Sequence, residues 1–109
     1  FEYLGLSDPA GAELARFLYD DGEVLTISVI SPKCKTASGI GVGSTATEVL
    51  KAYPKGEIHG SDIGDMASIS FEDLNVFFVL NVKFGGYDLT PEEEASIDPD
   101  ALKVTEIAL

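Results

Sequence analysis

Residues 45–54 form the one segment of this chain that reads as a helix with both of its ends marked. Thr45 and Glu48 have the T-x-x-E spacing of a capping box, in which each side chain accepts a hydrogen bond from the backbone N–H of the other residue. Apolar residues follow at helical spacing, and Pro54 ends the pattern because proline disfavours the α conformation in the residue before it. The sequence therefore predicts a main helix of about nine residues, and strands must supply most of the remaining core.

Most other apolar residues alternate with polar ones, a period of two that is typical of strands with one buried face. Two such runs, 13–19 and 24–30, flank an Asp21-Gly22 pair, which favours a hairpin. For the first run, a short helix capped by Ser7 is an alternative. Three further runs are predicted to form strands: 67–72, 75–82 and 102–109.

These segments follow one another as strand, strand, helix, strand, strand, strand. This order predicts an α+β fold with an antiparallel sheet of about five strands and the main helix packed on one face. Residues 55–65 are rich in glycine and aspartate and predict a loop, and Thr90-Pro91 predicts a short turn of helix within 85–101. The length of 109 residues indicates that residues 1–109 form one domain.

The charge of the chain disfavours some classes of partner. Nineteen Asp and Glu oppose seven Lys and Arg, which gives a net charge of −12. Nucleic-acid binders gain affinity from Lys and Arg that neutralise phosphates, so the sequence predicts no nucleic-acid partner, and the same argument disfavours anionic lipid. The longest apolar runs are far shorter than the ~20 residues of a membrane-spanning helix. Simple solubility explains this charge best, and a cationic partner is the alternative.

The stretch TASGIGVGSTATEVLKAYP, residues 36–54, raises the question of a phosphate-binding loop. A P-loop needs a lysine directly before its Ser or Thr, and no lysine precedes Ser44. A dinucleotide-binding fingerprint needs G-x-G-x-x-G in a βαβ unit, whereas this stretch reads G-x-G-x-G and the rest of the chain predicts antiparallel strands. We therefore interpret the stretch as a structural motif in which a short extended piece leads into the helix. Its residues are Gly39, Gly41, Gly43, Thr45 and Glu48.

The candidates for nucleophilic catalysis are one cysteine and one histidine, Cys34 and His59. A cysteine nucleophile needs a base within reach, and both residues lie in segments that resemble loops. A single cysteine also forms no internal disulfide. The sequence therefore predicts no catalytic residue, although a pocket that joined Cys34 to His59 would favour an enzyme.

Three acidic groups are candidates for a cation site: Asp62 with Asp65, Glu92 to Glu94, and Asp98 with Asp100. The last group begins an EF-hand pattern but fails it, since Leu102 stands where the fifth-position ligand is required. Favourable charge at a helix start explains the second group better. We therefore predict no metal site and no cofactor, while weak binding of a cation by these loops stays an alternative.

The residues from Lys35 to Tyr53 resemble a pattern in small bacterial envelope proteins of unassigned function, some of them lipoproteins: K-T-x-x-G-I-x-V-G-[ST]-T-x-x-E-[VL]-x-x-x-Y. The part from Val42 to Val49 is distantly similar to the helix start of the SmpA/OmlA lipoprotein of outer-membrane barrel assembly and of β-lactamase-inhibitor-protein-like domains. SmpA/OmlA places helices ahead of a three-stranded sheet, whereas this chain begins with a predicted hairpin. Cys34 stands in no lipobox, so a barrel-assembly role is not carried over.

What the resemblance implies is a bacterial, exported, non-catalytic domain of the periplasm or the outer cell envelope, with a targeting segment ahead of Phe1. We expect such a domain to bind a protein or cell-wall partner through a face of its sheet or through its loops. The alternatives are a module that binds a small ligand or a cation through acidic loops, and an enzyme. An exposed apolar patch would favour the first hypothesis, and carboxylates clustered around a cavity would favour the second.

Overall fold

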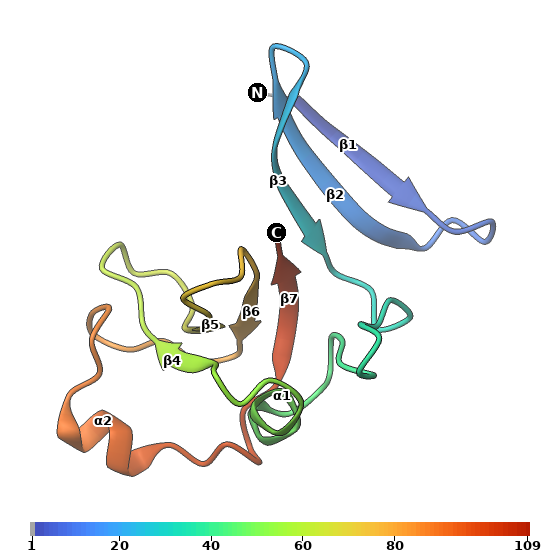
Figure 1. Ribbon diagram of the computed structural model, residues 1–109. Helices are drawn as coiled ribbons and strands as arrows, with labels where there is room; N and C mark the ends of the chain where they lie inside the picture. The colour runs from blue at the N-terminus through green and yellow to red at the C-terminus, as the bar shows by residue number, and fades with distance from the viewer. Residues whose placement is uncertain (1) are drawn as a thin grey trace.

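The computed structural model describes residues 2–109 as a seven-stranded antiparallel sheet with two short helices (Figure 1). Along the chain the elements are β1 (Glu2–Ser7), β2 (Glu13–Asp20), β3 (Glu23–Val29), α1 (Ala46–Ala52), β4 (Glu57–His59), β5 (Ser68–Ser70), β6 (Phe77–Leu80), α2 (Pro91–Ser96) and β7 (Val104–Ala108). Across the sheet the strands lie in the order β1-β2-β3-β7-β6-β5-β4. The prediction of an α+β fold with an antiparallel sheet and one main helix is confirmed, but the sheet has more strands than predicted.

The two additional strands lie where the sequence analysis predicts none. β1 precedes the predicted hairpin, and Leu4 and Leu6 give it a period of two. β4 lies inside the predicted loop 55–65, and its three residues are too few for a periodic pattern to stand out. The alternative helix capped by Ser7 is wrong, because the residues concerned form β2 and pair with both β1 and β3. The stretch 39–43, expected to be extended, forms turns and a single bridge instead.

Both helices begin with a capping box. In α1, the Glu48 N–H donates to Thr45 Oγ1 at 3.2 Å and the Thr45 N–H donates to the Glu48 carboxylate at 3.0 Å. Thr90 and Glu93 repeat this exchange at the start of α2, at 3.1 and 2.9 Å. The helices have seven and six residues. Within residues 2–109, no helix is long and apolar enough to cross a membrane.

The main core lies between α1 and the half of the sheet formed by β5, β6 and β7. Its buried residues are Ile40, Ala46, Val49, Ile69, Phe78, Leu80, Val104 and Ile107. Tyr53, just after α1, completes it by stacking on Phe78 with 5.8 Å between ring centroids. The apolar face that the sequence analysis assigns to the helix is therefore the face turned to the sheet.

One row of apolar residues crosses all seven strands on the side that faces this core. Each residue of the row is paired with the next across neighbouring strands, in the order Leu6, Ala15, Val29, Ile107, Phe78, Ile69 and Ile58. Directly paired residues point to the same side of an antiparallel sheet. The core side of the sheet is therefore apolar from one edge strand to the other.

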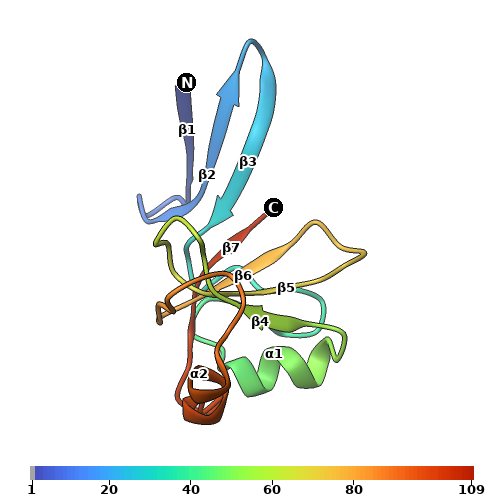
Figure 2. The ribbon, with the colours of Figure 1, turned by 90° about the vertical axis from the view of Figure 1, so that its left-hand side faces the viewer.

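Strands β1, β2 and β3 form a ribbon that extends beyond the rest of the sheet (Figures 1 and 2). The ribbon joins the rest through β3, which shares only two residue pairs with β7, Ser28 with Ala108 and Val29 with Ile107. In Figure 2, α1 lies below β4, and the ribbon rises away from it. All six residues of β1 are exposed. The core side of the ribbon therefore lacks the cover that α1 gives to the other strands.

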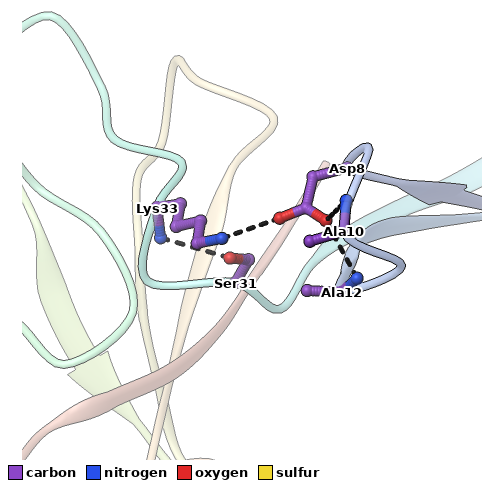
Figure 3. Close-up of polar contacts among 5 residues, drawn as sticks. All are labelled: Asp8, Ala10, Ala12, Ser31 and Lys33. Atoms are coloured by element: carbon purple, nitrogen blue, oxygen red, sulfur yellow. Dashed lines mark hydrogen bonds and ion pairs between the residues drawn. The ribbon is translucent and has the colours of Figure 1, made fainter.

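Asp8 fixes the base of the ribbon (Figure 3). One oxygen of its carboxylate accepts from the N–H groups of Ala10 and Ala12, both at 2.9 Å, and the other accepts from the Lys33 ammonium at 2.7 Å. The Lys33 N–H in turn donates to Ser31 Oγ at 3.2 Å. These bonds tie the β1–β2 turn to the segment after β3, and the hydrogen bond from Lys33 lowers the pKa of Asp8.

Candidate functional site

The glycine-rich connection between β3 and α1 is built for close backbone contact. Gly43 has a φ of +95°, a conformation that only glycine adopts freely. Its N–H donates to the Val104 carbonyl at 2.8 Å, and the Val104 N–H donates to the Ser44 carbonyl at 2.8 Å. A Cβ at Gly41 would lie 2.7 Å from the Cys34 carbonyl oxygen. The glycines thus let this connection turn tightly and pair with the start of β7.

The first turn of α1 has no N–H group left for a phosphate. The Ala46 N–H donates to the Leu102 carbonyl at 2.9 Å, and the Thr47 N–H donates to the Pro99 carbonyl at 3.3 Å. The Glu48 N–H is bound by the capping box. Phosphate-binding loops depend on free N–H groups at this position. The contacts therefore favour the structural interpretation of the glycine-rich stretch over the phosphate-binding one.

Cys34 and His59 lie in separate parts of the molecule. Cys34 follows β3, whereas His59 ends β4, and β7, β6 and β5 lie between these two strands. The His59 ring stacks on the Tyr87 ring with 4.4 Å between centroids, and its Nε2 lies 3.4 Å from a Glu57 carboxylate oxygen. Neither hollow that His59 lines includes Cys34. The two residues therefore lack the contact that a cysteine nucleophile and its base require.

The acidic groups singled out in the sequence hold loops together. Asp62 accepts a hydrogen bond from the Tyr87 N–H at 3.0 Å, and Glu93 accepts one from the Gly85 N–H at 3.0 Å. Asp98 accepts one from the backbone two residues further on at 3.1 Å. Among residues 2–109, no three His, Cys, Asp or Glu side chains are arranged to hold a metal ion. The acidic loops therefore use these carboxylates to fix their own backbone.

A cleft of about 800 Å³ opens beside β4 and β5. Its walls include the rings of His59, Phe71 and Tyr87 and the carboxylates of Glu57, Glu72 and Asp73. All three acidic residues are exposed, and Lys55 lines the same cleft. The cleft is therefore open to water, and its negative charge is partly balanced.

The core side of the ribbon forms a second candidate site, which we call the open apolar face: Leu4, Leu6, Phe17, Tyr19 and Val24. Leu4 pairs with Phe17 and Tyr19 pairs with Val24, so these side chains point to one side of the sheet. Leu4 is 59% exposed and Val24 is 58% exposed. Four of the five, all but Leu6, line a hollow of about 320 Å³. Large apolar side chains are thus gathered on a surface open to solvent.

An acidic margin borders the hairpin end of the open apolar face. It consists of four exposed residues, Glu2, Asp20, Asp21 and Glu23. Glu2 is paired with Tyr19 across β1 and β2 and so lies on the side of the face, and hydrogen bonding to Glu2 raises the pKa of Tyr19. Asp20 and Glu23 are paired with each other and point to the opposite side, as does Arg16, the ribbon's one Lys or Arg. With four acidic residues and no cation among its members, the margin makes the hairpin end of the ribbon negative.

Searches of family models, curated proteins and solved structures find no match to this chain. The choice between the candidate sites therefore depends on their own geometry. The cleft beside β4 is lined by exposed acidic groups from different segments, whereas the open apolar face gathers its side chains on three paired strands.

The open apolar face is the site that the sequence analysis missed. The sequence predicts no strand before residue 13. The signal was present, since Leu4 and Leu6 alternate just as Leu25 and Ile27 do. A strand pattern indicates which side of a strand is apolar, but it contains no information on whether another element covers that side.

Proposed function

We propose that this protein is a non-catalytic interaction domain of the bacterial cell envelope, and that it binds its partner through the open apolar face. One observation carries the proposal: the apolar row crosses all seven strands, while the helix covers only the strands beyond the ribbon. On the ribbon, Leu4, Leu6 and Val24 are exposed, and Phe17 and Tyr19 are half-buried. The largest contiguous apolar patch on a soluble monomer is typically about 300–600 Å² and is often the functional one.

The rest of the surface supports this choice of site. With a net charge of −12, the chain presents acidic groups over most of its surface, and an exposed apolar area stands out against them. Polar residues would keep the ribbon soluble at no cost to the core, because the open apolar face makes no contact with α1. Leucine, valine and phenylalanine at these positions therefore suggest a bound state in which they are covered.

A neutral apolar dye tests whether the open apolar face binds apolar groups. Nile red should fluoresce with the folded parent, and Leu4→Ser combined with Val24→Ser should remove most of that signal. Tyr3→Ser is the matched control, since Tyr3 is 72% exposed on the same strand and points to the other side. Equal fluorescence from the parent and the double variant, with unchanged melting curves, would refute the proposed binding face.

The envelope location rests on the resemblance of residues 35–53 to envelope proteins. Fractionation of the source cells with an antibody against the domain tests it separately. The protein should be recovered with the periplasmic or outer-envelope fraction. Recovery with the cytosol would remove the location from the proposal and leave the binding face untouched.

The cleft beside β4 supports a second candidate function, binding of a small organic cation. Three carboxylates and the stacked rings of His59 and Tyr87 offer ion pairing together with the negative face of an aromatic ring. Titration of an arylalkyl ammonium salt, followed by NMR, should then shift the signals of His59 and Tyr87 but not those of the ribbon. Binding there, without Nile red binding to the ribbon, would favour this function over the first.

A further inference from the structure

We propose that the open apolar face receives an amphipathic helix whose polar side is basic, supplied by a partner protein. This inference rests on the proposed function and adds the chemistry of the partner. Three features of the molecule lead to it: the way the same sheet is covered elsewhere, the size of the face, and the sign of the charge at its border.

The molecule already covers the same side of its sheet with an amphipathic helix. Ala46 and Val49 of α1 are fully buried in the core cluster that includes Ile107. Ile107 is paired with Val29, and Val29 with Ala15, so the open apolar face continues the surface on which α1 lies. A second helix placed beside α1 would therefore bury side chains of the same kind on the same side.

The size of the face fits one helix better than a second copy of the domain. Its three strands have six, eight and seven residues. With strand spacings of about 4.8 Å and a rise of about 3.4 Å per residue, the whole ribbon measures roughly 14 by 24 Å, and the open apolar face is no larger than this. That area, about 340 Å², is well below the ~800 Å² that each partner buries in a standard interface. A helix is about 10 Å wide, and about 16 residues span 24 Å.

The charge at the border of the face selects a basic partner. The acidic margin places four exposed carboxylates at the hairpin end, and one of them, Glu2, is paired with Tyr19 on the side of the face. A second copy would bring a second acidic margin and a further net charge of −12. Lysine or arginine along the flanks of a bound helix would instead lie near opposite charges, which speeds association and excludes acidic competitors.

An added strand is the competing mode of binding. β1 is an edge strand, and an extended peptide could pair with its free N–H and C=O groups. Pairing at that edge would leave Phe17, Tyr19 and Val24 uncovered, because they lie on β2 and β3. A helix laid across the ribbon covers all three, so the helix accounts for more of the exposed apolar surface.

Three synthetic peptides of about 16 residues test the inference by titration into the ¹⁵N-labelled protein. The first has leucine at helical spacing and lysine elsewhere, the second has the same composition with leucine and lysine alternating, and the third is the helical peptide with glutamate in place of lysine. The helical Leu/Lys peptide should bind most tightly and shift the signals of Leu4, Phe17, Tyr19 and Val24. Leu4→Ser should weaken it about tenfold or more, and the Tyr3→Ser control should leave its affinity unchanged.

Several outcomes would overturn the inference while leaving the open apolar face as a binding surface. Tighter binding of the alternating peptide would establish strand addition at β1. Equal binding of the Leu/Glu and Leu/Lys helices at low salt would remove the charge argument. A dimer of the free protein that Leu4→Ser dissociates would identify a second copy as the occupant. If no peptide shifts the signals of the face and Nile red does not bind, the proposed function itself is wrong.

Discussion

Gly43 holds a backbone conformation that other residues adopt at a cost, because its φ is +95°. A Cβ there would meet no atom within 4 Å, so any loss on substitution comes from the backbone rather than from a clash. Gly43→Ala should therefore lower the free energy of unfolding by about 1–2 kcal/mol, the usual penalty for a left-handed L-residue. Urea denaturation of the parent and the variant measures this difference.

Gly85→Ala is the control for that prediction. Gly85 is exposed, and an added Cβ would come no closer than 4.0 Å to the nearest atom, Glu93 Oε2. This variant should unfold at nearly the same urea concentration as the parent. Equal losses in the free energy of unfolding at both positions would mean that the left-handed conformation of Gly43 adds no cost to the substitution.

At the scale of an element, the capping box of α1 makes helix stability depend on pH. Hydrogen bonds from the Thr45 N–H and then from the Thr45 hydroxyl lower the pKa of Glu48 from 4.5 in the folded protein. As the pH falls, the unfolded chain therefore binds a proton at Glu48 before the folded protein does. The contribution of ionised Glu48 to the free energy of unfolding is complete above pH 4.5 and is lost as the pH falls through the folded pKa.

Comparison with Glu48→Gln isolates this effect, since glutamine fits the capping box but does not titrate. The parent should be the more stable of the two at pH 7, and the difference in free energy of unfolding should shrink between pH 5 and pH 3, the range around the reference pKa of 4.5. Urea denaturation at each pH provides the measurement. A difference that stays constant over this range would contradict the assigned pKa shift. At pH 7, Thr45→Ala should cost about 1 kcal/mol, because it removes the cap itself.

The sequence predicts those elements whose signals are local. Asp21 and Gly22 have φ values of +50° and +79°, as the Asp-Gly hairpin signal requires, and the T-x-x-E spacing is a capping box in the structure. β4 has no such signal: its three residues form a strand because β5 lies beside them. Whether the shortest strands form thus depends on pairing between distant segments. Neither the hydrophobic period nor the turn residues of the sequence indicate that pairing.

At the scale of the whole molecule, the site was harder to predict than the fold. The apolar pattern of β2 and β3 reads as two core strands, and Val29 does contact the core. Phe17 follows the same pattern, and Val24 joins its side through the register shift between Leu18 and Tyr19. Both lie beyond the reach of α1, which is only seven residues long. Whether an apolar side is covered depends on the length and position of the covering element, and the strand sequence contains neither.

The ribbon should open independently of the rest of the molecule. It is attached to the main sheet along one short seam, which consists of two β3–β7 residue pairs, two backbone hydrogen bonds between Ile27 and Leu109, and the hydrogen bond from Ser28 to Glu106. Local opening costs little where few buried apolar contacts are lost. Native-state hydrogen exchange should therefore be faster in the β1–β2 ladder, for example at Phe17, than at Phe78 or Ile107 in the core.

Exchange from the ribbon should also slow selectively when the helical Leu/Lys peptide is bound, because the bound helix would supply the missing apolar contacts. Equal protection of the ribbon and the core in the free protein would contradict this description, since it would mean that the ribbon unfolds only when the whole molecule does.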